Sequence, residues 1–133
     1  MMNGYQKYKE AAIYSMSAPE LLLVLFDEAI SRLKKAQFAL EDEEYSMFED
    51  CLNRVNRIVR YLIDILDRSQ PLSWDLIRIY RYLMMDIGRI RAGRQRQKDE
   101  IGRVIHILSE LREGFEEASR RAGDVHQGRQ GRL

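Results

Sequence analysis

Cysteine and histidine are scarce in this sequence: Cys51 is the single cysteine, and His106 and His126 are the two histidines. One cysteine excludes an intrachain disulfide, and because nothing else indicates an oxidising compartment, a reducing cytosol is expected. A di-iron carboxylate bundle would need Glu-x-x-His pairs, but Arg103 and Gly123 stand three positions before the two histidines. The sequence therefore predicts no metal site and no cofactor.

Glycine-rich phosphate-binding loops are absent as well, because the glycines are scattered along the chain. Cys51 and a single helical histidine, His106, do not make a nucleophile and its base. We expect Cys51 to be buried in the core and His106 to lie at the surface or the boundary of its helix. No catalytic residue and no enzymatic activity are therefore predicted.

Long hydrophobic runs are also missing. The longest uninterrupted one, Leu21 to Phe26, has six residues, whereas a membrane-spanning helix needs about 20. The first twenty residues are polar and lack the apolar stretch of a secretory signal. We therefore expect a cytoplasmic protein with no membrane insertion.

Neither sign of charge dominates, because 22 lysines and arginines face 21 aspartates and glutamates, for a net charge of +1. This balance argues against a general nucleic-acid binder. Residues 89–103 are an exception with six basic residues, which could bind phosphates. Aromatic residues that would stack on bases are not interleaved there, and the basic connector at 94–98 can pair with the acidic turn at 41–44. No nucleic-acid binding is therefore expected.

What the sequence does contain is apolar residues at alternating spacings of three and four, which indicates amphipathic helices. Neither an alternating strand pattern nor an internal repeat is found. Helices are expected at 18–41, 45–67, 74–92 and 99–121. Their core stripes are Leu22, Phe26, Ala29, Leu33, Ala36 and Leu40; Phe48, Leu52, Val55, Val59, Leu62 and Leu66; Leu76, Tyr80, Leu83, Ile87 and Ile90; and Ile101, Val104, Leu108, Leu111, Phe115 and Ala118.

Four helices of this length, joined by short loops, predict an all-α fold: an antiparallel up-down four-helix bundle. We expect the bundle to occupy residues 17–121. A tyrosine-bearing leader, a short docking segment, precedes it at 1–16, and a disordered tail follows at 122–133.

Local signals mark the expected helix ends. Ser17 and Glu20 have the spacing of a capping box, and Pro19 lies in the first turn, where its missing N–H costs nothing. Ser73 is the expected N-cap of the third helix, and Gly93 is its expected stop.

Some apolar residues lie off the core stripes, and they gather at one end of the expected bundle. The first two turns of the helix at 18–41 are apolar almost all round, and the next two helices carry a similar surplus. Such a surface must be covered by the chain itself or by a partner. We predict a peptide-binding groove lined by Leu21, Leu25, Ile58, Tyr61, Ile65, Ile79, Tyr82 and Met85.

Three blocks of the chain have distinctive patterns. Met16 to Ile30 has a Pro-Glu-Leu helix opening and a leucine-rich run that ends in an aromatic and an acidic residue. Ile58 to Asp67 ends in Leu-Asp, and Leu76 to Leu83 reads L-x-x-I-Y-x-Y-L. These blocks resemble the FliS family of flagellar secretion chaperones: the second is similar to its I-x-x-L-x-x-x-L-D stretch, and the third to its L-x-x-(L/I)-Y-x-Y-(M/L) signature. The resemblance covers about residues 5–120. The chain departs from it in the arginine-rich connector and at Phe115, where the family usually has tryptophan.

The resemblance implies a helical bundle in the cytosol that binds the C-terminal segment of flagellin and prevents its premature polymerisation. It further implies delivery of flagellin to the cytoplasmic domain of the export-gate membrane protein in flagellar type III secretion. No cofactor and no catalysis are implied.

The leader carries Tyr5, Tyr8 and Tyr14. We expect it to fold over part of the groove when no client is present, and to act as a switch. A different class of function stays open from the residues alone: a self-associating structural bundle, which would form a homodimer through the same apolar end and bind no peptide.

Overall fold

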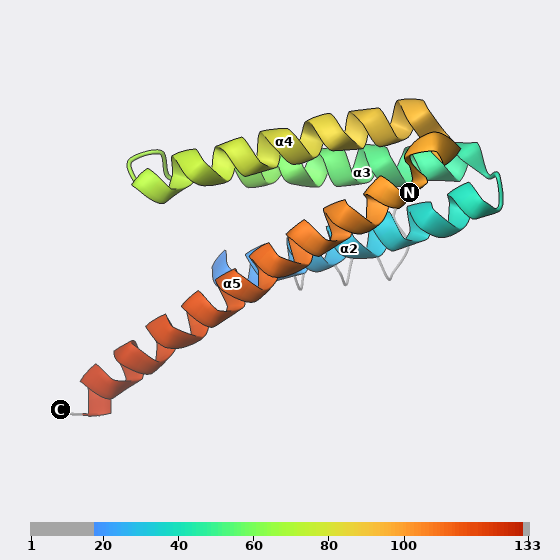
Figure 1. The fold of residues 1–133 in the computed structure, drawn as a ribbon. Coiled ribbons are helices and arrows are strands. Elements are labelled where there is room, and N and C mark those ends of the chain that lie inside the picture. The colour runs from blue at the N-terminus through green and yellow to red at the C-terminus, as the bar shows by residue number, and fades with distance from the viewer. Residues whose placement is uncertain (1–17, 132–133) are drawn as a thin grey trace, which may run out of the picture.

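A computed structural model describes residues 18–131, with side chains described for 18–123. Its helices are α2 (Ala18–Glu41), α3 (Tyr45–Asp64), α4 (Pro71–Gly93) and α5 (Lys98–Gly131), and a short 3-10 helix, η1 (Arg94–Gln97), joins the last two. Consecutive helices run antiparallel (Figure 1). Both α2 and α4 pack against α3 and α5, so the four helices close a ring. The predicted all-α antiparallel four-helix bundle is confirmed.

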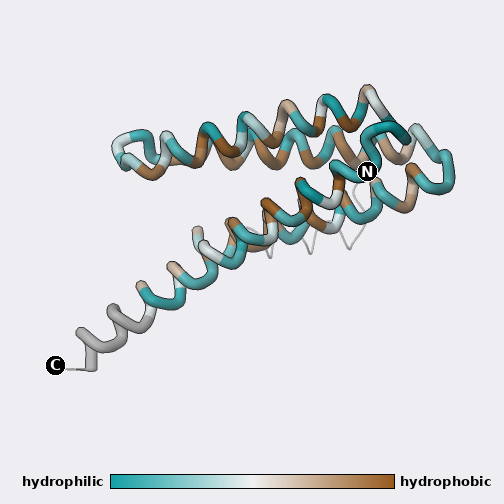
Figure 2. Tube along the Cα trace, in the orientation of Figure 1, coloured by the Kyte–Doolittle hydropathy of each residue, from teal (hydrophilic) through white to brown (hydrophobic). Residues whose placement is uncertain are grey.

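The predicted core stripes supply the core. Figure 2 shows the hydrophobic stretches of the helices on the sides that face one another. Five stripe residues, all toward the same end of the bundle, stay partly or fully exposed: Leu22, Leu66, Leu111, Phe115 and Ala118. We call that end, where α3 turns into α4, the open end. The opposite end, with the α2–α3 turn and η1, is the closed end.

The α2–α3 turn at the closed end is a Schellman motif. The N–H of Glu44 donates to the carbonyl of Ala39 at 2.8 Å, and the N–H of Glu43 donates to the carbonyl of Leu40 at 3.1 Å. Glu43 has a φ of 56°, in the left-handed region that usually holds glycine at this position. The last carbonyls of α2 are therefore satisfied in a tight reversal.

Side chains of the connector after α4 seal the closed end. Lys98 lies 3.9 Å from Glu41, which confirms that the basic connector reaches the acidic turn. Arg94 pairs with Glu49 at 3.8 Å instead, and its guanidinium lies 4.1 Å from the centre of the Tyr45 ring. A cation over an aromatic face is a favourable contact, so η1 is held against the start of α3.

The turn at the open end differs from the prediction. Helix α4 begins at Pro71, with Gln70 as its N-cap, because proline is well suited to the first helical position. The prediction that Ser73 caps α4 is wrong: its hydroxyl donates to the carbonyl of Asp67 at 2.6 Å and so ties the turn together. Helix α3 correspondingly ends at Asp64, earlier than expected.

Helix α5 continues to Gly131, beyond the end that the sequence predicted at 121. Ion pairs one turn apart stabilise the stretch up to the predicted end, since Glu117 lies 3.0 Å from Arg121 and Glu116 lies 3.8 Å from Arg120. The boundary predicted at residue 122 therefore does not coincide with a helix end. The leader and the Ser17 cap lie outside the described residues.

Candidate peptide-binding surface

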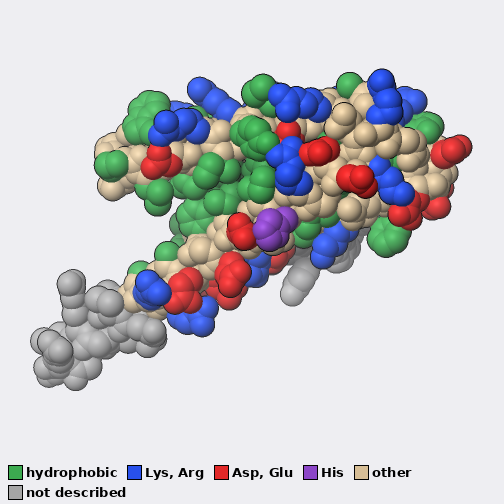
Figure 3. All heavy atoms as spheres, viewed as in Figure 1, with side chains coloured by type: hydrophobic (Ala, Val, Ile, Leu, Met, Phe, Trp, Pro, Cys, Tyr) green, Lys and Arg blue, Asp and Glu red, His purple; other side chains and the backbone are tan. Residues whose placement is uncertain are grey.

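A hollow of about 430 Å³ lies at the open end, and we call it the end groove. Figure 3 shows hydrophobic side chains gathered between α4 and α5 toward the α3–α4 turn. All four helices contribute to its mostly apolar wall: Ala18, Pro19, Leu22, Leu62, Ile65, Leu66, Asp67, Tyr80, Phe115, Ala118 and Ser119. Four of the five exposed or partly exposed stripe residues thus line this groove: Leu22, Leu66, Phe115 and Ala118.

Aromatic side chains form part of the wall of the end groove. Phe115 stacks on the fully buried Phe26, with ring centroids 5.6 Å apart and an interplanar angle of 29°. Tyr80 is also buried, and burial raises the pKa of its hydroxyl to about 12 because the phenolate would lose its hydration. The apolar surroundings of Tyr80 therefore favour the neutral phenol over the phenolate.

A second hollow, of about 310 Å³, lies in the seam between α2 and α3, and we call it the α2–α3 groove. It is lined by Val24, Leu25, Glu28, Arg54, Arg57, Ile58 and Tyr61. Tyr61 is 44% exposed and stands one helical turn before Ile65, which lines the end groove. The two grooves therefore follow one another along α3.

A third hollow, of about 470 Å³, lies on the other side of the bundle between α4 and α5, and we call it the α4–α5 groove. Its wall consists of Arg78, Ile79, Tyr82, Ile107, Glu110 and Leu111. Leu111 stands one turn before Phe115, so this groove also leads to the open end. An extended peptide could pass from one seam to the other through the end groove.

The Tyr82 ring in the α4–α5 groove is held by Arg103. The Arg103 guanidinium donates to the Tyr82 hydroxyl, lies 5.4 Å from the centre of its ring, and donates to the buried carboxylate of Asp86 at 2.9 Å. Hydrogen bonds to Tyr82 and Glu100 hold the pKa of Arg103 above its ordinary value. The positively charged Arg103 therefore links Tyr82, in the groove wall, to the buried carboxylate of Asp86.

Six of the eight predicted residues line one of the three grooves, namely Leu25, Ile58, Tyr61, Ile65, Ile79 and Tyr82. The first three belong to the α2–α3 groove, the fourth to the end groove and the last two to the α4–α5 groove. Leu21 is partly buried and Met85 is exposed, and neither lines a groove. The predicted residues thus lie on two sides of the bundle. The leader tyrosines Tyr5, Tyr8 and Tyr14 lie outside the described residues.

Sequence reasoning assigned several groove residues to the core alone: Leu22, Leu62, Leu66, Tyr80 and Phe115. It also missed Leu72 and Trp74, which are exposed beside the α3–α4 turn. Pro71 was the signal that could have found these two. Read as the first helical residue, it places both side chains on the opening turn of α4, where no earlier turn covers them.

We also looked for metal ligands, reactive side chains and membrane-spanning helices among the described residues. No group of three or more metal-ligating side chains occurs in the part of the chain with described side chains. Cys51 is buried and His106 is exposed, 3.1 Å from Glu110, and both placements were predicted. Among the helices described, none is long and apolar enough to cross a membrane.

Most of the chain matches one known family, whose model, described as Flagellar protein FliS, covers residues 1–122. The chain therefore belongs to the FliS family, and the resemblance seen in the sequence is confirmed. This is a family of flagellar export chaperones and not of enzymes, which fits the prediction that the chain has no catalytic residue. None of the curated proteins matches the chain.

Proposed function

We propose that this member of the FliS family is a cytoplasmic chaperone that binds the C-terminal segment of flagellin. By covering that segment it would prevent premature polymerisation, and it would then deliver flagellin to the cytoplasmic domain of the export-gate membrane protein. Family membership supports the role in flagellar export. The apolar hollows at the open end support the binding of a peptide.

The end groove is the observation that carries the proposal. If every residue of the core stripes were buried, neither end of the bundle would expose apolar side chains. At the open end, however, Leu22, Leu66 and Phe115 stay accessible to solvent. Exposed apolar patches of this kind are typical of interaction sites. An amphipathic client segment gains free energy when its apolar side leaves water, so a groove reached from two seams suits a client that wraps around the open end.

The client path that we propose starts in the α2–α3 groove, crosses the end groove and ends in the α4–α5 groove. Leu25, Ile58, Tyr61, Ile65, Ile79 and Tyr82 would contact the client along it. Met85 lies just under one turn after Tyr82, toward the closed end, and would extend the track at its α4–α5 end. Leu21 lies one turn before Leu25, toward the open end, and would contact the client where it passes from the α2–α3 groove into the end groove.

The leader is proposed to compete for the same surface. Tyr5, Tyr8 and Tyr14 would cover part of the track in the absence of a client and leave it when flagellin arrives. Such a switch requires that the leader and the client make different contacts in the two states.

The experiment is calorimetric titration of the chain with a peptide of about forty residues from a flagellin C-terminus. We expect one-to-one binding with a negative heat-capacity change, because apolar surface is buried. The variant Tyr61→Asp/Ile65→Asp, at two exposed positions, should bind at least about tenfold more weakly. Phe38→Asp, at an exposed apolar position near the closed end, is the control and should bind like the wild type.

Failure of the folded wild type to bind the peptide would overturn the proposal. A wild type that binds no peptide but shows a concentration-dependent mass in sedimentation would instead support the homodimer. Equal weakening by the control variant would show that the peptide binds through some other part of the surface.

A further inference from the structure

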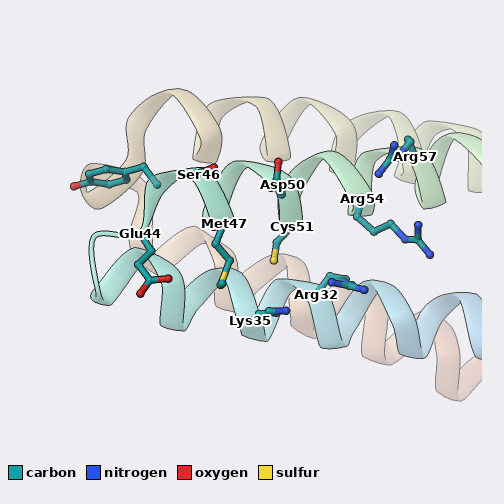
Figure 4. A pocket seen from close by; sticks show the side chains of 10 residues that line it. Arg32, Lys35, Glu44, Ser46, Met47, Asp50, Cys51, Arg54 and Arg57 are labelled. Carbon is teal, nitrogen blue, oxygen red and sulfur yellow. The ribbon is translucent and has the colours of Figure 1, made fainter. Parts of the chain in front are cut away.

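The seam between α2 and α3 holds another hollow, of about 750 Å³, nearer the closed end; we call it the basic cleft (Figure 4). Four cationic side chains line it: Arg32 and Lys35 of α2, and Arg54 and Arg57 of α3. In Figure 4 the Arg54 side chain reaches into the space between the two helices. The cleft thus receives positive charge from both of its walls.

Acidic side chains offset only part of this charge. Glu44 and Asp50 also line the cleft. Figure 4 shows the Asp50 carboxylate pointing away from α2, on the side of α3 where Arg57 also lies. Glu28, at the border with the α2–α3 groove, lies 3.1 Å from Arg32 and 3.8 Å from Arg54 and so serves two guanidinium groups.

Two of the cations have no such partner. Among the residues that the structure describes, neither Lys35 nor Arg57 forms an ion pair. Lys35 on α2 and Arg57 on α3 therefore carry positive charges that no described carboxylate pairs with, and Arg57 lies at the border between the cleft and the α2–α3 groove.

The basic cleft is continuous with the α2–α3 groove, because Arg54 and Arg57 line both. The seam thus has an apolar half, with Leu25, Ile58 and Tyr61, and a basic half closer to the closed end. Tyr61 and Arg54 are separated by about 10 Å along α3, from a rise of 1.5 Å per residue. A ligand anchored in the apolar half can reach the basic half with a single further stretch of chain.

We propose that the client segment in this seam carries aspartate or glutamate side chains beside its apolar anchors, and that the basic cleft binds them. The inference rests on the proposed function, and it adds the charge of the client and its direction along the seam. Arginine and lysine form charge-assisted hydrogen bonds with carboxylates. From the spacing, the acidic residues lie about three positions from the anchors in an extended client, or about seven in a helical one.

Charge at one half of the seam also fixes the orientation of the client. Electrostatic complementarity contributes specificity and register more than affinity. A client that entered the seam in the reverse direction would place its apolar anchors beside Lys35 and its carboxylates beside Leu25. The arrangement therefore selects one direction of binding.

The test compares Lys35→Glu/Arg57→Glu with the matched control Lys34→Glu/Arg60→Glu. The control changes the same net charge at exposed positions on the same two helices, and neither residue lines the cleft or the α2–α3 groove. Both variants are titrated with the flagellin C-terminal peptide at about 0.05 and 0.5 M salt, where screening differs strongly. Circular dichroism confirms that each stays helical.

We expect the cleft variant to bind about tenfold more weakly at low salt and to lose most of the salt dependence of the wild type. The dissociation constant of the control variant should differ from that of the wild type by less than about threefold, because the control changes only the net charge of the protein. A peptide in which all acidic residues are replaced by their amides should bind the wild type more weakly than the original peptide does. The cleft variant should bind this amide peptide no more weakly than it binds the original peptide.

The outcomes separate the two proposals. If the wild type binds no flagellin peptide at either salt concentration, the proposed function fails. If the wild type binds and the cleft variant binds equally well, or no worse than the control, the inference about the cleft is wrong. Binding of a duplex oligonucleotide that is lost in the cleft variant, with unchanged peptide binding, would also overturn it and assign the cleft to nucleic acid.

Discussion

The two ends of this bundle are built from the same stripe pattern but are packed differently. At the closed end Leu40, Phe48, Ile90 and Ile101 are fully buried. The side-chain amide of Gln95 in η1 donates to the carbonyl of Leu40 at 2.6 Å and caps this packing. The closed end is finished with both hydrogen bonds and apolar contacts.

At the open end the corresponding stripe positions keep part of their surface in water. Leu22, Leu66 and Phe115 line a groove there, and Figure 1 shows the α3–α4 pair separating from the α2–α5 pair toward this end. Ile65 and Trp74, which lie nearby, are about half exposed. A regular apolar stripe therefore fixes which side of a helix faces inward, but not how closely the facing helices approach.

The largest expected effect is on the free energy of unfolding, when one phenylalanine from each end is replaced by alanine. Phe48→Ala at the closed end should lower the free energy of unfolding by about 3–5 kcal/mol, because it leaves a cavity in a filled core. Phe115→Ala at the open end should cost only about 1–2 kcal/mol, because its ring is already partly in water. Urea denaturation followed by circular dichroism measures both losses. Equal losses would contradict the difference between the ends.

A smaller effect concerns pH and the wall of the end groove. The pKa of Tyr80 is raised from 10.0 to about 12, so the folded state holds the phenol proton more tightly than the unfolded state. This contribution is complete below pH 10 and is lost as the pH rises toward 12. The loss amounts to about 2–3 kcal/mol. Free energies of unfolding measured between pH 9 and about 12 should fall more steeply in the wild type than in Tyr80→Phe, and parallel curves would show that Tyr80 is hydrated.

The smallest effect lies in the turn of the closed end. Glu43 has a left-handed φ of 56°, which glycine adopts without strain, so Glu43→Gly should stabilise the fold by a few tenths of a kcal/mol to about 1 kcal/mol. Asp42→Gly is the matched control: Asp42 is exposed and its φ is not positive, so the change adds only freedom to the unfolded chain and should destabilise the fold. Thermal denaturation of the two variants would show shifts in opposite directions. A lower melting temperature for Glu43→Gly would mean that the Schellman turn is not strained.

Much of the fold was predictable from the sequence because helix periodicity is a local property. The bounds of α2 were predicted correctly, and the stripe residues of α4 are all buried. The start of α4 was predicted wrongly because Ser73 is a good N-cap by type, and only the folded turn shows that its hydroxyl bonds to Asp67. Local residue preference could not reveal that contact.

The candidate site was less predictable. The surplus of apolar residues indicated the end of the bundle where the end groove lies, and six of the eight predicted residues line grooves. The sequence could not show that Tyr80 and Phe115 serve both the core and the groove, since that depends on how far apart the helices stand. Nor could it show that Arg54 and Arg57 border two hollows, because that requires the register of α3 against α2.

The contact between Tyr82 and Arg103 has a consequence for the entropy of binding. Tyr82 and Tyr61 stand on opposite seams with similar exposure. Tyr82 is held by Arg103, which in turn is held by Asp86, whereas the Tyr61 hydroxyl forms no hydrogen bond with a described residue. Immobilising a free side chain on binding costs about 0.5–1.5 kcal/mol. Because Tyr82 is already held in place, it avoids most of that cost. We therefore expect a client to bind a preorganised surface in the α4–α5 seam, and a surface that must order its Tyr61 side chain in the α2–α3 seam.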